Sequence, residues 1–171
     1  VIPGLESSLM NVTPRVFTAT RQQFGDITPH SHRFNFQACV IRGTVKNVTY
    51  VRYGKGSNGE LKAPPRNDRN WGHYDLFRES TLDYQGDVGE HTVERGEHRW
   101  YKEVEREYKE GDWYGMMGNE IHRIWFSHDA VVLFLEGPDA QGTSKIIEPV
   151  VDGVEIDTYT VQPWMFKRTY A

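Results

Sequence analysis

The pattern with the clearest chemical meaning is a pair of histidines, His30 and His32, at the head of an apolar run over residues 34–42. In an extended chain alternate residues point to the same side, so both imidazoles share a face. A third histidine, His122, stands between a turn and another apolar run. Imidazole suits Fe, Zn, Ni and Cu better than Mg or Ca. We predict one divalent ion held by these three histidines, with positions left open for water or substrate, as in catalytic sites.

Gln37 is a candidate fourth ligand, because its amide oxygen is a neutral donor to a cation. Strict alternation turns Gln37 away from the face of His30 and His32, so it joins the site only if a bulge or bend intervenes. A His-x-His pair is by itself weak evidence, and ordinary loop and strand histidines are the alternative. The arrival of His122 in a second segment is what favours the metal site.

Several side chains near these two segments are candidates for the wall of a substrate site: Cys39, Tyr50, Trp113, Met116 and Trp125. Each has a structural alternative. A lone buried cysteine is usually a small apolar filler, and aromatic or methionine side chains equally pack a core or a dimer interface. The sequence leaves both interpretations open.

Composition limits the function classes. The 171 residues are 37% hydrophobic and 26% charged, with a net charge of −4. The chain has no basic field for nucleic acid or anionic lipid, and no apolar run of membrane-spanning length. Its single cysteine excludes an intrachain disulfide and favours a reducing, cytoplasmic compartment. These properties are typical of one globular domain over residues 1–171.

The periodicity predicts an all-β fold. Sixteen glycines and eight prolines separate short apolar or alternating runs. We expect strands near residues 15–20, 34–42, 45–53, 100–108, 122–126, 131–136, 145–151 and 156–162, the last two in a C-terminal region over 145–170. Residues 151–154 have the sequence of a two-residue hairpin.

Three stretches are less regular. Residues 5–12 are the one candidate for a short helix. The charged run 97–112 allows a helix or a strand, and its alternation favours a strand. The turn-rich stretch 54–96 is expected to leave the barrel or sandwich as an excursion, with a short hairpin at 73–84, and to serve as a lid or a surface loop.

The chain resembles the cupins, whose two motifs contain His-x-His followed by a glutamate, and later a glycine followed at fixed spacing by a histidine. His30 and His32 match the first motif, and Gly111 and His122 match the second. Gln37 replaces the glutamate, with four residues between it and His32. Met117, Asn119 and Phe126 replace the proline, the glycine and the final asparagine of the second motif. The resemblance covers about residues 24–137 and implies a jelly-roll β-barrel.

The resemblance also implies a function. A three-histidine site is similar to those of cupin iron dioxygenases that oxidise thiols, while small bacteriophage and marine cupins of unassigned activity are a looser match. We expect a metal-dependent enzyme, dioxygenase-like and homodimeric, acting on a small, anionic molecule. Fe(II) is the favoured metal, with Ni, Zn or Mn as alternatives. The competing hypotheses are an isomerase or lyase acting on a sugar or small acid, with or without metal, and a non-catalytic ligand-binding module.

Overall fold

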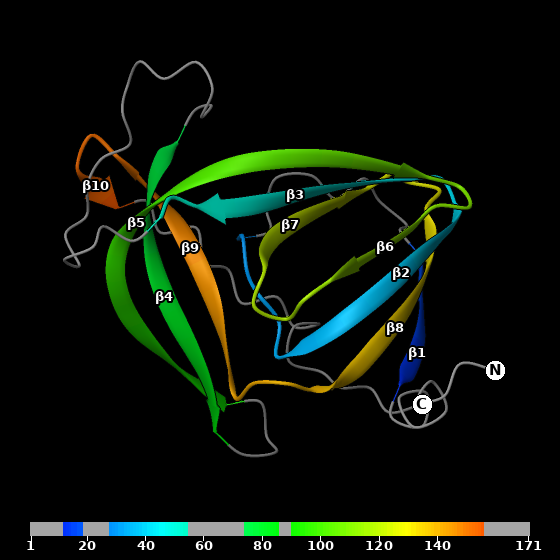
Figure 1. The fold of residues 1–171 in the computed structure, drawn as a ribbon, viewed down its shortest axis with the longest axis horizontal. Coiled ribbons are helices and arrows are strands. Elements are labelled where there is room, and N and C mark those ends of the chain that lie inside the picture. The colour runs from blue at the N-terminus through cyan, green and yellow to red at the C-terminus, as the bar shows by residue number, and fades with distance from the viewer. Residues whose placement is uncertain (1–11, 19–27, 55–73, 86–89, 156–171) are drawn as a thin grey trace.

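Two antiparallel sheets make up the fold of the computed structural model, which describes residues 12–18, 28–54, 74–85 and 90–155 (Figure 1). The smaller sheet has the order β1-β8-β2-β6 and the larger the order β10-β9-β4-β5-β3-β7. Within the described ranges no helix is long and apolar enough to cross a membrane. The strands are β1 (Thr13–Thr18), β2 (Phe34–Arg42), β3 (Thr44–Arg52), β4 (Asp75–Gln85), β5 (Glu90–Lys109), β6 (Trp113–Met116), β7 (Ile121–Phe126), β8 (Val131–Asp139), β9 (Thr143–Val151) and β10 (Val154–Glu155).

The main core fills the space between the two sheets. Alternate residues of β2, from Phe36 to Val40, are buried and face this core, while Gln37 between them is exposed. The larger sheet contributes Val45 from β3 and Phe126 from β7. Removing a fully buried phenylalanine side chain from such a core costs about 3–5 kcal/mol. The buried members of the main core are Phe36, Ala38, Val40, Val45, Tyr114, Met116, Phe126, Ala130 and Val132.

A second core forms because the larger sheet curls on itself. The first half of β5 pairs with β4 and its second half pairs with β3, so one long strand serves both ends of the curl (Figure 1). Both faces of β3 are therefore covered: Val45 and Asn47 belong to the side of the main core, and Val48 and Tyr50 to the second. The second core contains Val48, Tyr50, Phe77, Tyr101, Ile121 and Ile147.

Part of the expected excursion over residues 54–96 is instead sheet. Residues 75–85 form β4, which lies between β9 and β5 inside the larger sheet, and β5 begins at residue 90. The polar composition of β4 favoured a loop over a buried strand. Its charged residues are accommodated in the sheet because Arg78 is paired with Glu148 and Glu79 with Lys145. Residues 55–73 and 86–89 lie outside the described ranges.

Other expectations have mixed outcomes. The expected strand over the charged run is confirmed as part of β5. The hairpin at residues 151–154 is also confirmed, with Asp152 and Gly153 both at positive φ, as a tight antiparallel turn requires. The strand expected at 131–136 extends further, because β8 continues to Asp139, and β6 was not expected. The short helix at 5–12 and the strand at 156–162 fall on residues outside the described ranges, apart from Val12.

Gly43 carries the chain from one sheet to the other. It follows the last residue of β2 and precedes the first of β3, and its φ is +79°. A Cβ at this position would lie 2.8 Å from the Cα of Ala130 and 2.6 Å from the Oγ of Ser127. A side chain is therefore excluded both by the backbone conformation and by space.

We predict that Gly43→Ala lowers the free energy of unfolding by about 2–4 kcal/mol, through a positive-φ penalty and a clash with backbone. Chemical denaturation of matched variants separates the two causes. Gly111→Ala has positive φ but open space and should cost about 1 kcal/mol, whereas Gly142→Ala has neither constraint and should be nearly neutral. Equal effects at Gly43 and Gly111 would contradict the clash.

Candidate metal centre

The histidine pair lies on an extended segment, residues 28–32, that is held by backbone hydrogen bonds on several sides. His30 and His122 exchange two N–H to O bonds of 2.9 Å with each other, which ties the segment to β7. On the other side, Ser31 N–H donates to the carbonyl of Lys145 at 2.8 Å, and Lys145 N–H donates back to Ser31 Oγ at 2.8 Å, which ties it to β9. His32 N–H donates to the carbonyl of Gly118 at 2.8 Å. The segment is thus fixed although it forms only isolated bridges.

The three predicted histidines come together. One ligand nitrogen from each of His30, His32 and His122 can be chosen so that all lie within 4.8 Å of one another. The Nε2 atoms of His32 and His122 are 2.9 Å apart. Nitrogens bound at about 2.1 Å to one ion lie about 3–3.5 Å from each other, so the separation of the His32 and His122 nitrogens is close to that of two ligands of one ion. His30 and His122 are each only 3% exposed, whereas His32 is partly exposed.

Two hydrogen bonds fix which ring nitrogens carry protons. His30 Nδ1 lies 2.9 Å from the carbonyl oxygen of Thr28, and His122 Nδ1 lies 2.8 Å from Oδ1 of Asn47. Both oxygens can only accept, so both Nδ1 atoms are protonated and both Nε2 atoms present a lone pair. In the bond between His32 and His122, His32 is then the donor. To ligate an ion through Nε2, His32 must move that proton to its Nδ1.

All three imidazoles favour the neutral form, because the pKa of each lies below its usual value. Burial lowers the pKa of His30, although its hydrogen bond to Thr28 opposes the shift. Burial and the neighbouring His30 lower the pKa of His32 to about 3. The pKa of His122 is also well below its usual value, because of burial and then the proximity of His32 and His30. A neutral imidazole is the form that binds metals, so protons do not compete for the site near neutral pH.

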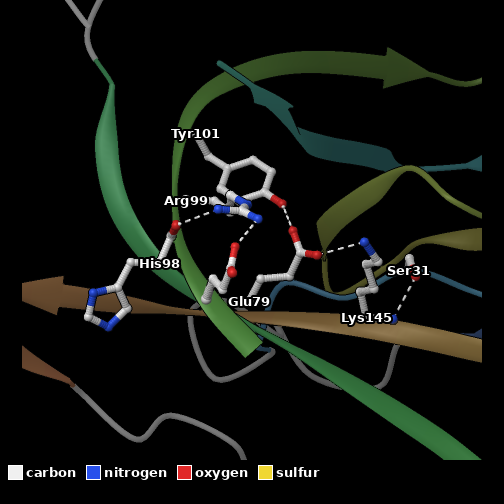
Figure 2. A network of polar contacts seen from close by, with 7 residues as sticks. Ser31, Glu79, His98, Arg99, Tyr101 and Lys145 are labelled. Atoms are coloured by element: carbon white, nitrogen blue, oxygen red, sulfur yellow. Dashed lines mark hydrogen bonds and ion pairs between the residues drawn. The ribbon is translucent and has the colours of Figure 1, made fainter. Parts of the chain in front are cut away.

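A charged network supports the reverse side of the histidine segment (Figure 2). Lys145, whose backbone holds Ser31, extends its Nζ to 2.6 Å from Oε1 of Glu79, and the hydroxyl of Tyr101 donates to the other oxygen of Glu79. Burial alone would raise the pKa of Glu79, but these two hydrogen bonds outweigh it and lower the pKa. The network joins β4, β5 and β9 behind the segment that carries the histidines.

The structure does not bring Gln37 into the cluster. Phe36, its neighbour on β2, faces the histidines, with ring centroids 5.4 Å from His32 and 5.8 Å from His122. Gln37 is exposed on the opposite face. The pairing of β2 with β8 is irregular between Phe34 and Phe36, but alternation still turns Gln37 outward.

The other candidates divide between the two faces of their strands. Met116 lies beside the cluster, since its Sδ accepts a hydrogen bond of 3.2 Å from Asn47 Nδ2. Tyr50 faces the second core and donates to Glu103, so it points away from Asn47. Trp125 alternates with Ile124 and Phe126, which contribute to the main core, and its ring lies 5.6 Å from Lys46 Nζ.

Cys39 and Trp113 are also turned from the cluster. They pair across β2 and β6, on the face opposite to Ala38 and Tyr114, which belong to the main core. Cys39 is a free thiol and is buried, whereas Trp113 is 55% exposed. Neither has a contact with the histidines that would support a role in substrate binding.

Sequence reasoning missed the residues that orient the ligands, namely Thr28, Ser31 and Asn47. Asn47 carried a usable signal. It is a polar residue at a position where the alternation of Val45 predicts an inward side chain, and a buried amide needs partners. Thr28 acts through its carbonyl oxygen, which any residue provides, so its side chain gave no signal.

Comparison with known proteins adds no assignment. No family model, no curated protein and no solved structure matches this chain.

We predict that the metal-free protein loses stability as the pH falls below about 6.5. The folded pKa values of the three histidines lie below the unfolded value, so the unfolded chain binds more protons in the window from about 6.5 down toward 3. The free energy of unfolding should therefore fall there by on the order of 1 kcal/mol per pH unit for each histidine that titrates. Urea titrations of chelator-treated protein at pH 7.5, 6 and 5 measure it.

The control for this prediction is His32→Gln, which removes one of the three titrating groups and should reduce the slope. His128→Gln changes an exposed histidine and should leave the slope unchanged. A flat profile in the wild type, or an equal slope in His32→Gln, would contradict the prediction.

We also predict that Asn47→Leu destabilises the metal-free protein by about 1–3 kcal/mol, because it leaves the buried Nδ1–H of His122 without its acceptor. Asn47→Asp restores an acceptor and should raise the pKa of His122, which NMR titration of the ring detects. If Asn47→Leu were as stable as the wild type, the hydrogen bond would not be fixing the ring.

Proposed function

We propose that His30, His32 and His122 hold one divalent transition metal ion. The observation that carries this proposal is the convergence of three neutral imidazoles, two of which are anchored through Nδ1 so that Nε2 is free to ligate. Hydrogen bonding of the remote ring nitrogen is the usual way in which proteins orient metal-bound histidines. A purely structural role for the three imidazoles would not require ligand nitrogens of all three to face one another.

The donor set favours a catalytic over a structural ion. Structural zinc sites are closed by four protein ligands, whereas this cluster offers three among the described histidine, cysteine and acidic residues. The partly exposed ligand, His32, marks the side from which further ligands approach. With three neutral ligands the ion keeps its full charge of +2, and it binds an anion or acidifies a water more strongly than an ion neutralised by carboxylates.

The activity we propose is that of a metal-dependent enzyme acting on a small anionic molecule, with an oxidoreductase of the dioxygenase kind as the favoured reaction. The preference for Fe(II) rests on the resemblance to three-histidine cupins, and Fe(II) would supply the reaction with O2. His30 and His122 hold the ligand geometry, His32 completes it, and the ring of Phe36 packs against both His32 and His122 and keeps water from that side. The two facing antiparallel sheets support a cupin-type jelly roll.

The decisive test is the metal content of protein purified without a histidine tag, measured by elemental mass spectrometry. We expect about one iron, nickel, zinc or manganese per chain in the wild type, and less than a tenth of that in His32→Ala and in His122→Ala. His128→Ala, which changes an exposed histidine, should keep the wild-type content. Circular dichroism confirms that the variants are folded.

Reconstitution decides the reaction class. If no divalent metal is retained or taken up by the wild type, the proposal is wrong. If the iron form consumes O2 with small thiols or acids and the zinc form does not, the oxidoreductase assignment stands. Turnover by the zinc or nickel form without O2 would instead assign an isomerase or lyase.

A further inference from the structure

An aromatic wall adjoins the accessible side of the histidine cluster. It consists of Phe34 and Phe36 on β2 and Phe134 on β8. The ring centroids of Phe34 and Phe36 lie 5.1 and 5.4 Å from that of His32. Phe134 lies 4.5 Å from Phe36 and 6.5 Å from Phe34, centroid to centroid. The three phenyl rings therefore form one continuous surface that begins at His32.

The members of this wall differ in exposure. Phe36 is 4% exposed and belongs to the main core, so packing explains it. Phe34 and Phe134 are partly exposed, as is His32. Strand alternation puts Phe34 on the same face of the smaller sheet as Phe36, and Phe134, which pairs with Ala38, lies on that face too. A molecule that reaches the cluster from the side of His32 therefore meets two phenyl rings.

The charged side chains on the core-facing side of the smaller sheet balance one another without the histidines. Among the described residues of β1, β2, β6 and β8 that face the main core, the charged ones are Arg15 and Glu136, which form an ion pair of 2.9 Å. No residual negative charge from these strands compensates an ion at the cluster. The charge of +2 on a bound ion would be partly neutralised by an anionic substrate.

We propose that the site selects a small anion with an apolar, flat body, such as an aromatic carboxylate, phenolate or thiolate. The anionic atom binds the ion held by His30, His32 and His122, and the ring packs on Phe34 and Phe134. This inference rests on the proposed function, because it needs the ion. It goes further by excluding sugars and other strongly hydrated acids as preferred ligands, since they would leave the phenyl rings covered by polar groups.

The test compares benzoate with acetate, two carboxylates that differ in the ring. The protein is loaded with Co(II), whose visible absorption reports changes in coordination, and each ligand is titrated into the wild type. We expect benzoate to bind at least tenfold more tightly than acetate. In Phe34→Leu and Phe134→Leu the preference should fall below threefold while acetate affinity is unchanged. Trp125→Leu, an aromatic change on the opposite face of β7, should keep the full preference.

Each outcome either supports or overturns the inference. Equal binding of the two ligands by the wild type overturns the inference, as does an undiminished preference in both leucine variants, or tight benzoate binding by cobalt-free protein. The wild-type comparison needs no substitution, so it stands even if a variant fails to fold. Elemental analysis distinguishes failure of the metal site from failure of the ligand preference. If cobalt is taken up without any ligand preference, only the inference is wrong. If cobalt is not taken up, the metal site and the inference are both wrong.

Discussion

The structure depends on the short ladder that fixes residues 28–32 between β7 and β9. β7 is one edge of the larger sheet, and β9 is next to the opposite end, so His30 links the two ends of the curl through its bridges to His122 and Ile146. Ile147 N–H also donates to the carbonyl of Pro29 at 3.0 Å. These bonds are made by main-chain atoms in a buried place, where each unmade bond costs about 1–3 kcal/mol. The ladder therefore fixes the position of both ligand-bearing segments at the same time.

The two sides of that ladder differ in electrostatics. The difference favours the binding of a cation on the side of the histidines. On the side of the second core, Glu79 forms an ion pair with Lys145. Within the histidine cluster the polar groups are neutral imidazoles, hydrogen-bonded to a carbonyl and an amide. A carboxylate there would already have compensated the site with a proton or a cationic partner. Neutral donors leave a cation as the favoured addition.

The sequence was sufficient for the parts of the site that depend on local geometry. His30 and His32 share a side because an extended chain alternates, and a third histidine at the head of β7 could be predicted from motif spacing. Gln37 could not be settled locally, since its direction depends on how β2 pairs with β8 across an irregular register. The position of Phe134 could not be predicted either, because its approach to Phe36 is a contact between different strands.

In the fold too, features set by local geometry were predicted, and features set by contacts between distant strands were not. Strands with apolar alternation, such as β2 and β9, were predicted within two residues of their observed bounds. The segment of β4 was expected only as part of a short hairpin at 73–84, because Arg78 and Glu79 are typical of loops unless their partners on β9 are known. Hydrophobic periodicity predicts which positions of a strand are buried. It does not predict whether a buried charge is paired, because the partner is distant in the chain.

The order in which the chain can fold follows from the same ladder. His32 and His122 are ninety residues apart, and the ladder also needs residues 145–147 of β9. Contacts between such distant residues form late, because the intervening chain must first be ordered. The ligands therefore assemble only after nearly all of the described chain has been synthesised and folded. An ion would join a finished protein and slow its unfolding, and it would contribute nothing to the speed of folding.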